Sequence, residues 1–235
     1  MNLLQRTKRL FVSRYLENMV INKSAVERNY GRYKGRVMFP STHDITDSPE
    51  VQEACFTVIG KLLEAGNDVL ITTKPKLLIT QDIIAQFHAY REQLQFRFTI
   101  TSVNNQLLSF WEPSAPTFEE RFASLKYAYE NNFKTSVSIE PFLDYAPQEL
   151  INILSAYITE SIWLGPMNYI PVSNISDVDK HQYEEIRKKY QTDHLREIYE
   201  ELQGNPLIRF KDSMANRLNL TNHPQISVEM SNFFN

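Results

Sequence analysis

The chain has 235 residues and a formal net charge of −3, with 42% hydrophobic and 23% charged residues. This is the composition of one large globular domain, and the charge gives no global electrostatic case for binding nucleic acid or an anionic membrane. The single cysteine, Cys55, excludes an internal disulfide and any metal site built only from cysteines of this chain. No apolar run is long enough for a membrane span or a signal peptide, so we expect a cytoplasmic protein.

The first predicted elements are a helix over residues 3–20 and a strand over 37–39. Apolar and basic side chains alternate at helical spacing in this helix. The helix would either pack on the exterior of the domain or bind a partner, and packing is favoured. The strand runs straight into hydroxyl, imidazole and carboxylate side chains. A helix over 50–66 follows, opened by Asp47, Ser48 and Pro49, with Cys55 on its apolar face.

The strand–helix unit then recurs along the chain. Strands are predicted over 69–73, 96–101, 135–140 and 161–164, with helices over 81–93, from Thr117 to Asn131, and over 147–157. This alternation predicts βα units, a parallel sheet and right-handed crossovers. Five such strands would form either an open doubly wound sheet or a partial barrel. A helix over 179–203 and a polar tail close the chain, with no internal linker.

Polar side chains gather where the predicted strands end. The carboxyl ends of parallel strands share one face, so residues far apart in sequence become neighbours there. Alternate residues of a strand also share a face, and an inward polar stripe suits a ligand cavity better than a filled apolar core. The residues are Ser41, Thr42, His43 and Asp44; Thr72, Thr73 and Lys74; Thr99, Thr101 and Ser102; Ser136, Ser138 and Glu140; and Gly165 and Asn168.

Each of these residues also has a purely structural explanation. Serine and threonine in strands often bond neighbouring backbone, and His43 with Asp44 could simply form the turn after a strand. Glu140 could form an ion pair with Lys74 or Arg97. The sequence has no glycine-rich phosphate loop, nucleophile elbow or zincin motif. The residues alone therefore predict a parallel α/β domain with a polar site at its strand ends.

Five stretches and a closing segment carry a resemblance to a known family. Together they resemble radical S-adenosylmethionine (radical SAM) proteins of the spore-photoproduct-lyase-like group, over roughly residues 29–214. The long pattern around WEPSAPTFEERFASLKYA makes the resemblance specific. The segments are NYGRYKGRVMFPSTHDIT, AGNDVLITTKP, FRFTITSVNNQLLSFWEPSAPTFEERFASLKYA, TSVSIEPFLD, ESIWLGPMNYI and ELQGNPLIRFKDS.

The resemblance implies a partial (β/α)6 barrel of the TIM-like radical SAM type. The implied organisation is an incomplete core barrel over 1–178, without its first strand, and a helical C-terminal extension over 179–235 packed on the same domain. In the family, a 4Fe-4S cluster on a CxxxCxxC loop binds S-adenosylmethionine, which is cleaved to a radical. By position, the residues that would bind the cofactor are Ser41 and Thr42, at its methionyl amino group, and Lys74, Thr101, Ser102, Ser138, Glu140 and Asn168.

The chain departs from the family in its cysteines. It has no CxxxCxxC motif, and Met1 falls about where the family's cluster loop has just ended. Three thiolates are the usual protein ligands when one iron is left for the cofactor, and neither Cys55 nor His43 replaces them. We therefore expect no metal site in this chain and no radical chemistry from it unaided.

Three functions follow for testing. The first is a radical SAM core whose cysteine loop and first strand come from a separate or upstream polypeptide. The second is a cluster-free binding or scaffold protein derived from such a barrel, with a nucleotide or nucleic-acid site. The third is a metal-independent α/β enzyme in which His43 and Asp44 together act as a general base. It is favoured least, because no activated nucleophile accompanies them. The substrate is not indicated.

Overall fold

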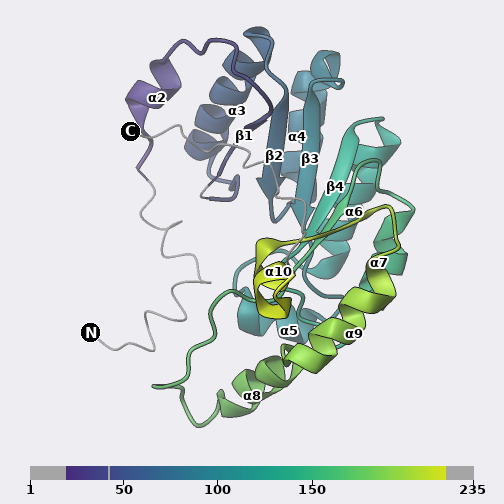
Figure 1. Cartoon of the computed structure of the whole chain (residues 1–235). Coiled ribbons are helices and arrows are strands. Elements are labelled where there is room, and N and C mark those ends of the chain that lie inside the picture. The colour runs from purple at the N-terminus through teal and green to yellow at the C-terminus, as the bar shows by residue number, and fades with distance from the viewer. Residues whose placement is uncertain (1–19, 42, 221–235) are drawn as a thin grey trace.

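The computed structural model describes residues 20–41 and 43–220, in which strands and helices alternate around one parallel sheet (Figure 1). Each strand pairs in parallel with the next one along the chain, so the spatial order equals the chain order. The predicted α/β class with a parallel sheet is therefore confirmed. The strands are β1 (Val37–Met38), β2 (Val69–Thr73), β3 (Leu94–Thr99), β4 (Lys134–Ile139), β5 (Ile162–Leu164) and β6 (Ile208–Phe210).

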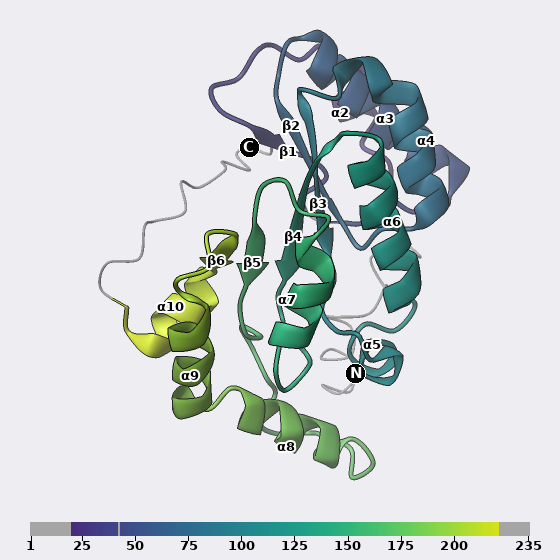
Figure 2. The same ribbon diagram turned by 90° about the vertical axis from the view of Figure 1, so that its right-hand side faces the viewer.

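The helices between the first five strands lie on the same side of the sheet (Figure 2). A right-handed crossover to the next strand always returns on the same face, and the strand order β1 to β6 never reverses. The helices on this side cover the apolar face of the sheet and share one hydrophobic core with it. They are α3 (Pro49–Glu64), α4 (Leu77–Phe87), α6 (Phe118–Glu130) and α7 (Gln148–Ser155).

Helix ends follow the signals in the sequence at α3 and α6. Pro49 opens α3, whose chain leaves at Gly66 with φ of +80°, a conformation that suits glycine. The Thr117 hydroxyl accepts a hydrogen bond from the Glu120 N–H and caps α6. The predicted boundaries of these two helices are correct to within two residues.

The predicted helix over 179–203 is in fact two helices, α8 (Lys180–Lys189) and α9 (Thr192–Leu202). The chain turns at Tyr190, whose buried hydroxyl donates to the Phe142 carbonyl. Helix periodicity continues through this turn in the sequence, so the pattern alone does not locate it. The remaining described helices are α2 (Lys23–Glu27), η1 (His88–Tyr90), α5 (Asn105–Trp111) and α10 (Asp212–Leu218).

The sixth strand comes from the segment predicted to be a helical extension. Residues Ile208–Phe210 pair with β5, and their exposure alternates from buried to exposed to buried. Three residues of alternation are too short a signal to predict a strand. The predicted helix over 3–20 lies outside the described residues, apart from Val20. None of the described helices is both long and apolar enough to cross a bilayer.

The two faces of the sheet differ in chemistry. Side chains that point toward the helices are mainly apolar and buried, and they form the core of the domain. The opposite face, which we call the inner face, carries mostly polar and charged side chains, because the strand sequences alternate between the two types. The core side includes Val69, Ile71, Leu94, Phe96, Phe98, Val137, Ile139, Ile162 and Leu164.

A buried ion pair fixes the loop between α5 and α6. Arg121 and Glu112 lie 2.6 Å apart, and their side chains are only 0% and 4% exposed. The guanidinium also donates to the carbonyls of Pro116 at 2.8 Å and of Thr99 at 3.3 Å. The loop is thus tied both to α6 and to the end of β3. This contact gives the WEPSAPTFEER stretch a structural role.

Replacing Glu112 by glutamine should lower the free energy of unfolding by about 3–5 kcal/mol, because Arg121 would be left buried without a counter-charge. Urea denaturation measures the change. The matched control is Glu130→Gln, which removes the exposed i,i+4 pair with Lys126 on the same helix and should change stability little. Equal losses in the two variants would contradict the role given to the buried pair.

Candidate ligand site on the inner face

The inner face is arranged in rows that run across the strands. Strand register places Thr72, Arg97 and Ser136 side by side in one row. The next row toward the carboxyl ends holds Thr99, Ser138, Trp163 and Arg209. Of these, Thr99, Ser136 and Ser138 were predicted to face one interior, and the register confirms that they share a face.

Hydrogen bonds link the polar side chains of the inner face. Arg36 donates to Gln95, and the Gln95 amide donates to the Ser136 hydroxyl at 3.1 Å. Arg97 donates to the same hydroxyl at 3.4 Å, and its guanidinium lies 4.9 Å from the centre of the Trp163 ring. Gln95 and Ser136 are almost fully buried, which is tolerated because they are bonded.

Three residues of this network were not among the predicted site residues: Gln95, Arg97 and Trp163. A signal for two of them was available in LQFRFT, where Gln, Arg and Thr alternate with Leu and Phe. Alternate positions in a strand share a face, so Gln95 and Arg97 belong with Thr99. Trp163 has no such signal, because it sits in the wholly apolar run IWL.

Two hydrogen-bond donors on this side have no partner among the described residues. They are the hydroxyl of Thr101, just beyond β3, and the indole N–H of Trp163 on β5. Thr101 is fully buried, and Ser138 on the neighbouring strand is 7% exposed. A buried donor without a partner is costly and calls for an explanation, of which a bound polar ligand is one.

Glu140, the residue after β4, is held by two residues of the C-terminal segment. Its carboxylate lies 3.0 Å from the Lys211 ammonium and accepts a 2.6 Å hydrogen bond from the Ser213 hydroxyl. An ion pair of Glu140 with Lys74 or Arg97 was a structural alternative, but among the described residues the partner of Glu140 is Lys211. Lys211 follows a strand that the sequence pattern does not reveal, so its place beside Glu140 was not predictable.

Lys74 belongs to a separate cluster at the ends of β1 and β2. The Asp44 carboxylate accepts hydrogen bonds from the Lys74 N–H at 2.7 Å and the Thr73 hydroxyl at 3.1 Å. His43 instead contacts the Asp44 backbone carbonyl through Nδ1 at 3.0 Å. The two side chains therefore do not form a His–Asp pair that could act as a general base, and the interpretation of His43–Asp44 as a turn fits the geometry better.

Ser102 lies in a third cluster, formed with the loop after β4 and with α8. Its hydroxyl donates to Asp144, whose other carboxylate oxygen accepts from the Val103 N–H at 3.2 Å. Burial raises the pKa of Asp144 despite these bonds and the nearby Lys189 ammonium. Burial also lowers the pKa of Lys189, which donates to the Leu143 carbonyl. This cluster anchors the loop that follows Glu140.

The remaining predicted residues lie at the margins. Ser41 follows β1 and is exposed, and Asn168 beyond β5 is also exposed. Thr42 lies outside the described residues. The structure thus groups Thr101, Ser138 and Glu140 at the ends of adjacent strands, and it places Lys74 and Ser102 in their own clusters. The role of each in binding stays a prediction.

The chain does not fit an iron–sulfur cluster by its own residues. Cys55 is buried in α3, and burial raises the pKa of its thiol to about 11, so it is a poor thiolate ligand. Over residues 20–41 and 43–220, no three His, Cys, Asp or Glu side chains are grouped so that they could hold a metal ion.

Comparison with known proteins assigns no activity. No protein-family model matches the chain. The chain is similar to the uncharacterized protein ORF301 of Acidianus two-tailed virus, with 29% identity over 128 residues. The match covers 54% of this chain and 42% of the viral protein, so it spans less than half the length of that relative.

Replacing Asp144 by asparagine should flatten the pH dependence of stability. The folded-state pKa of Asp144 is raised, so its contribution to stability is present below the ordinary aspartate pKa, about 4, and is lost as pH rises through the folded-state value. Urea denaturation at about pH 4 and about pH 7 measures this effect. The free energy of unfolding of the wild type should fall relative to that of D144N as pH rises. A difference that grows in the opposite direction would contradict the raised pKa.

Proposed function

We propose that the chain is a radical SAM-type partial barrel that binds S-adenosylmethionine or a related nucleoside on its inner face and performs no radical chemistry alone. The strand order supports the barrel type. Six parallel strands in chain order, with helices on one side, match a segment of a (β/α) barrel, whereas a doubly wound sheet reverses its order. This assignment also agrees with the sequence resemblance over residues 29–214.

What supports binding is the inner face itself. Thr101 and Trp163 carry buried donors that have no partner among the described residues, and the Ser138 hydroxyl and the Glu140 carboxylate lie on or just after the strand between them. A nucleoside has ribose hydroxyls, ring nitrogens and charged groups that can pair with such residues. In parallel α/β folds, ligands bind at this end of the strands. The residues would bind and orient the ligand; no bond-breaking step is assigned to them.

Isothermal titration with S-adenosylmethionine tests this function. The wild type should bind, and Ser138→Ala should weaken binding by about tenfold, because a hydrogen bond to the ligand is lost. Ser155→Ala is the matched control, because among the described residues its hydroxyl bonds the Ile151 carbonyl within α7, on the helix side of the sheet. Absence of heat with the wild type at millimolar ligand would refute the proposed function.

A second candidate is a two-chain radical enzyme, in which another polypeptide supplies the cysteine loop and a further strand. The observation that favours it is β1, which has two residues and pairs only with β2 among the described strands. Such an edge presents unpaired backbone groups to which another strand can bind.

Anaerobic iron–sulfide reconstitution distinguishes the two candidates. The chain alone should stay colourless, because its one thiol is buried. Co-expression with the coding region upstream of Met1 should yield a brown, iron-containing complex if the cysteines lie there. A colourless product from the co-expression would count against the two-chain enzyme and leave nucleoside binding unaffected.

A further inference from the structure

The inner face of the sheet is positively charged. Arg97 and Arg209 point to it from β3 and β6, and Arg36 reaches it through its hydrogen bond to Gln95. None of the residues that the described strands present on this face is an aspartate or a glutamate. Like charges on one surface repel each other, so an anion placed among these arginines would be favoured.

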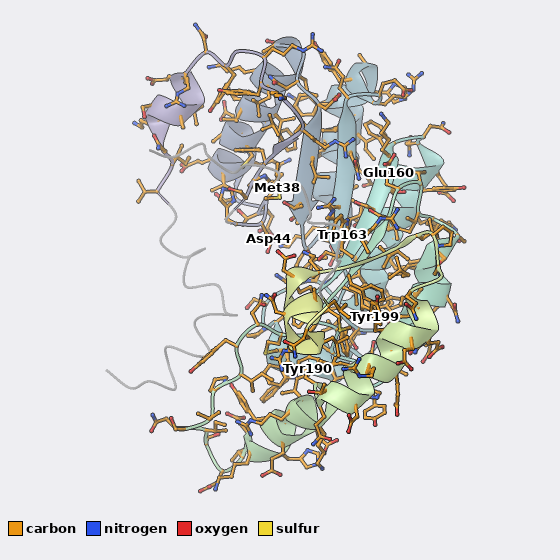
Figure 3. The ribbon with its side chains drawn as sticks, viewed as in Figure 1. Met38, Asp44, Glu160, Trp163, Tyr190 and Tyr199 are labelled. Carbon is orange, nitrogen blue, oxygen red and sulfur yellow. The ribbon has the colours of Figure 1, made fainter. Side chains whose placement is uncertain are left out.

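This face is also buried, although the helices between the strands cover the other side of the sheet (Figure 2). Leu70, Gln95 and Ser136 are 0%, 2% and 0% exposed. Figure 3 shows the inner face toward the viewer, with Met38 of β1 and Trp163 of β5 labelled on it. A face that combines apolar side chains with arginines suits an occupant that is mainly apolar and carries a negative charge.

The chain leaves the described part of the structure on the same side. Helix α10 lies on the opposite side of the sheet from α3, α4 and α6 (Figure 1, Figure 2). It ends at Asn219, and Leu220 packs against the core. The chain from Leu220 to Glu229 can extend about 30 Å, whereas β3 lies three strands from β6, about 15 Å away. Glu229 can therefore reach the middle of the inner face.

Residues 221–235 have the composition that this face favours. They contain one acidic side chain, Glu229, and no lysine or arginine. Large apolar side chains lie on both sides of it in the sequence, namely Ile226, Val228, Met230, Phe233 and Phe234.

We propose that residues 221–235 dock on the inner face of the sheet and that Glu229 pairs there with Arg97. Arg97 is half-buried at the centre of the face, whereas Arg209 is exposed at its edge. An ion pair at Arg97 is therefore less screened by water than one at Arg209. The apolar side chains of the segment cover Trp163 and the neighbouring strands. This inference does not depend on the proposed nucleoside ligand.

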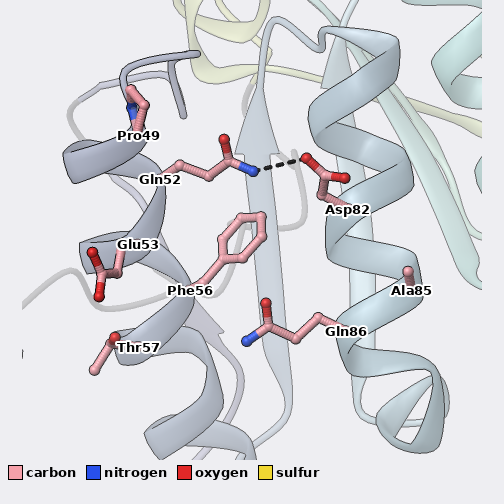
Figure 4. Close-up of a pocket in the computed structure, with 8 residues that line it drawn as sticks. All are labelled: Pro49, Gln52, Glu53, Phe56, Thr57, Asp82, Ala85 and Gln86. Carbon is pink, nitrogen blue, oxygen red and sulfur yellow. Dashed lines mark hydrogen bonds between the residues drawn. The ribbon is translucent and has the colours of Figure 1, made fainter.

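The groove between α3 and α4 does not suit this segment (Figure 4). It has a volume of about 690 Å³, and Glu53 and Asp82 are among the residues that line it. Asp82 also accepts a 2.9 Å hydrogen bond from Gln52 across the groove. The two carboxylates would repel Glu229. The groove is thus the competing docking surface that an experiment has to distinguish.

Limited proteolysis of the full chain tests the docking. Chymotrypsin cleavage after Phe233 and Phe234, followed by mass spectrometry, should be slower by about tenfold or more than in a free peptide of residues 221–235. Glu229→Gln and Arg97→Gln should each speed this cleavage by about tenfold. The double variant should be no faster than either, because both changes remove the same ion pair. Glu130→Gln, which removes the exposed pair with Lys126, should be cleaved like the wild type.

Photo-crosslinking locates the docked segment. Phe233→p-benzoylphenylalanine in the full chain should cross-link to inner-face residues such as Trp163 and Met38, and adding Glu229→Gln should lower the yield by about tenfold. This measurement decides the proposal if thermal unfolding shows that Arg97→Gln does not fold. Cross-links to the groove between α3 and α4, or between two copies of the chain, would overturn the proposal. So would wild-type cleavage at the rate of the free peptide, or additive effects of Glu229→Gln and Arg97→Gln.

Discussion

The constraint on which the structure depends is the uniform hand of its crossovers. Each crossover adds the next strand at the same edge of the growing sheet and with the same hand. The helices between β1 and β5 therefore gather on one face of the sheet. That face can then be mainly apolar, while the other face need not contribute to the core. The inner face is free to carry arginine, glutamine and hydroxyl side chains without weakening the hydrophobic packing that stabilises the domain.

The buried pair of Arg121 and Glu112 shows how a recognisable sequence pattern can be structural. Both residues belong to WEPSAPTFEER, on which the sequence resemblance mainly rests, yet Glu112 pairs with Arg121, and Arg121 donates to two backbone carbonyls. Their function here is to fix the connection between β3 and α6. A resemblance carried by such residues supports the fold more directly than it supports an activity.

Local periodicity was sufficient to predict the class of the fold and the first five strands, with boundaries within about two residues. It was also predictable that Thr99, Ser136 and Ser138 share one face of the sheet, because alternation along a strand is a local property. The partner of Glu140 was not, since Lys211 follows a strand of three residues that pairs with a distant segment. Likewise, the break at Tyr190 depends on a contact with Phe142 across the fold. Tertiary contacts of this kind leave no periodic trace in the sequence.

The late position of β6 in the chain has a consequence for folding. It joins β5 through residues 165–207, the longest connection between neighbouring strands of the sheet. Closing a longer loop costs more chain entropy, and contacts of high sequence separation slow folding. The pairing of β6 with β5 thus spans the largest sequence separation of any strand pair in the sheet. A ligand that bound at this end of β6 would stabilise the docking of the strand, so ligand occupancy and the completeness of the sheet would be thermodynamically linked.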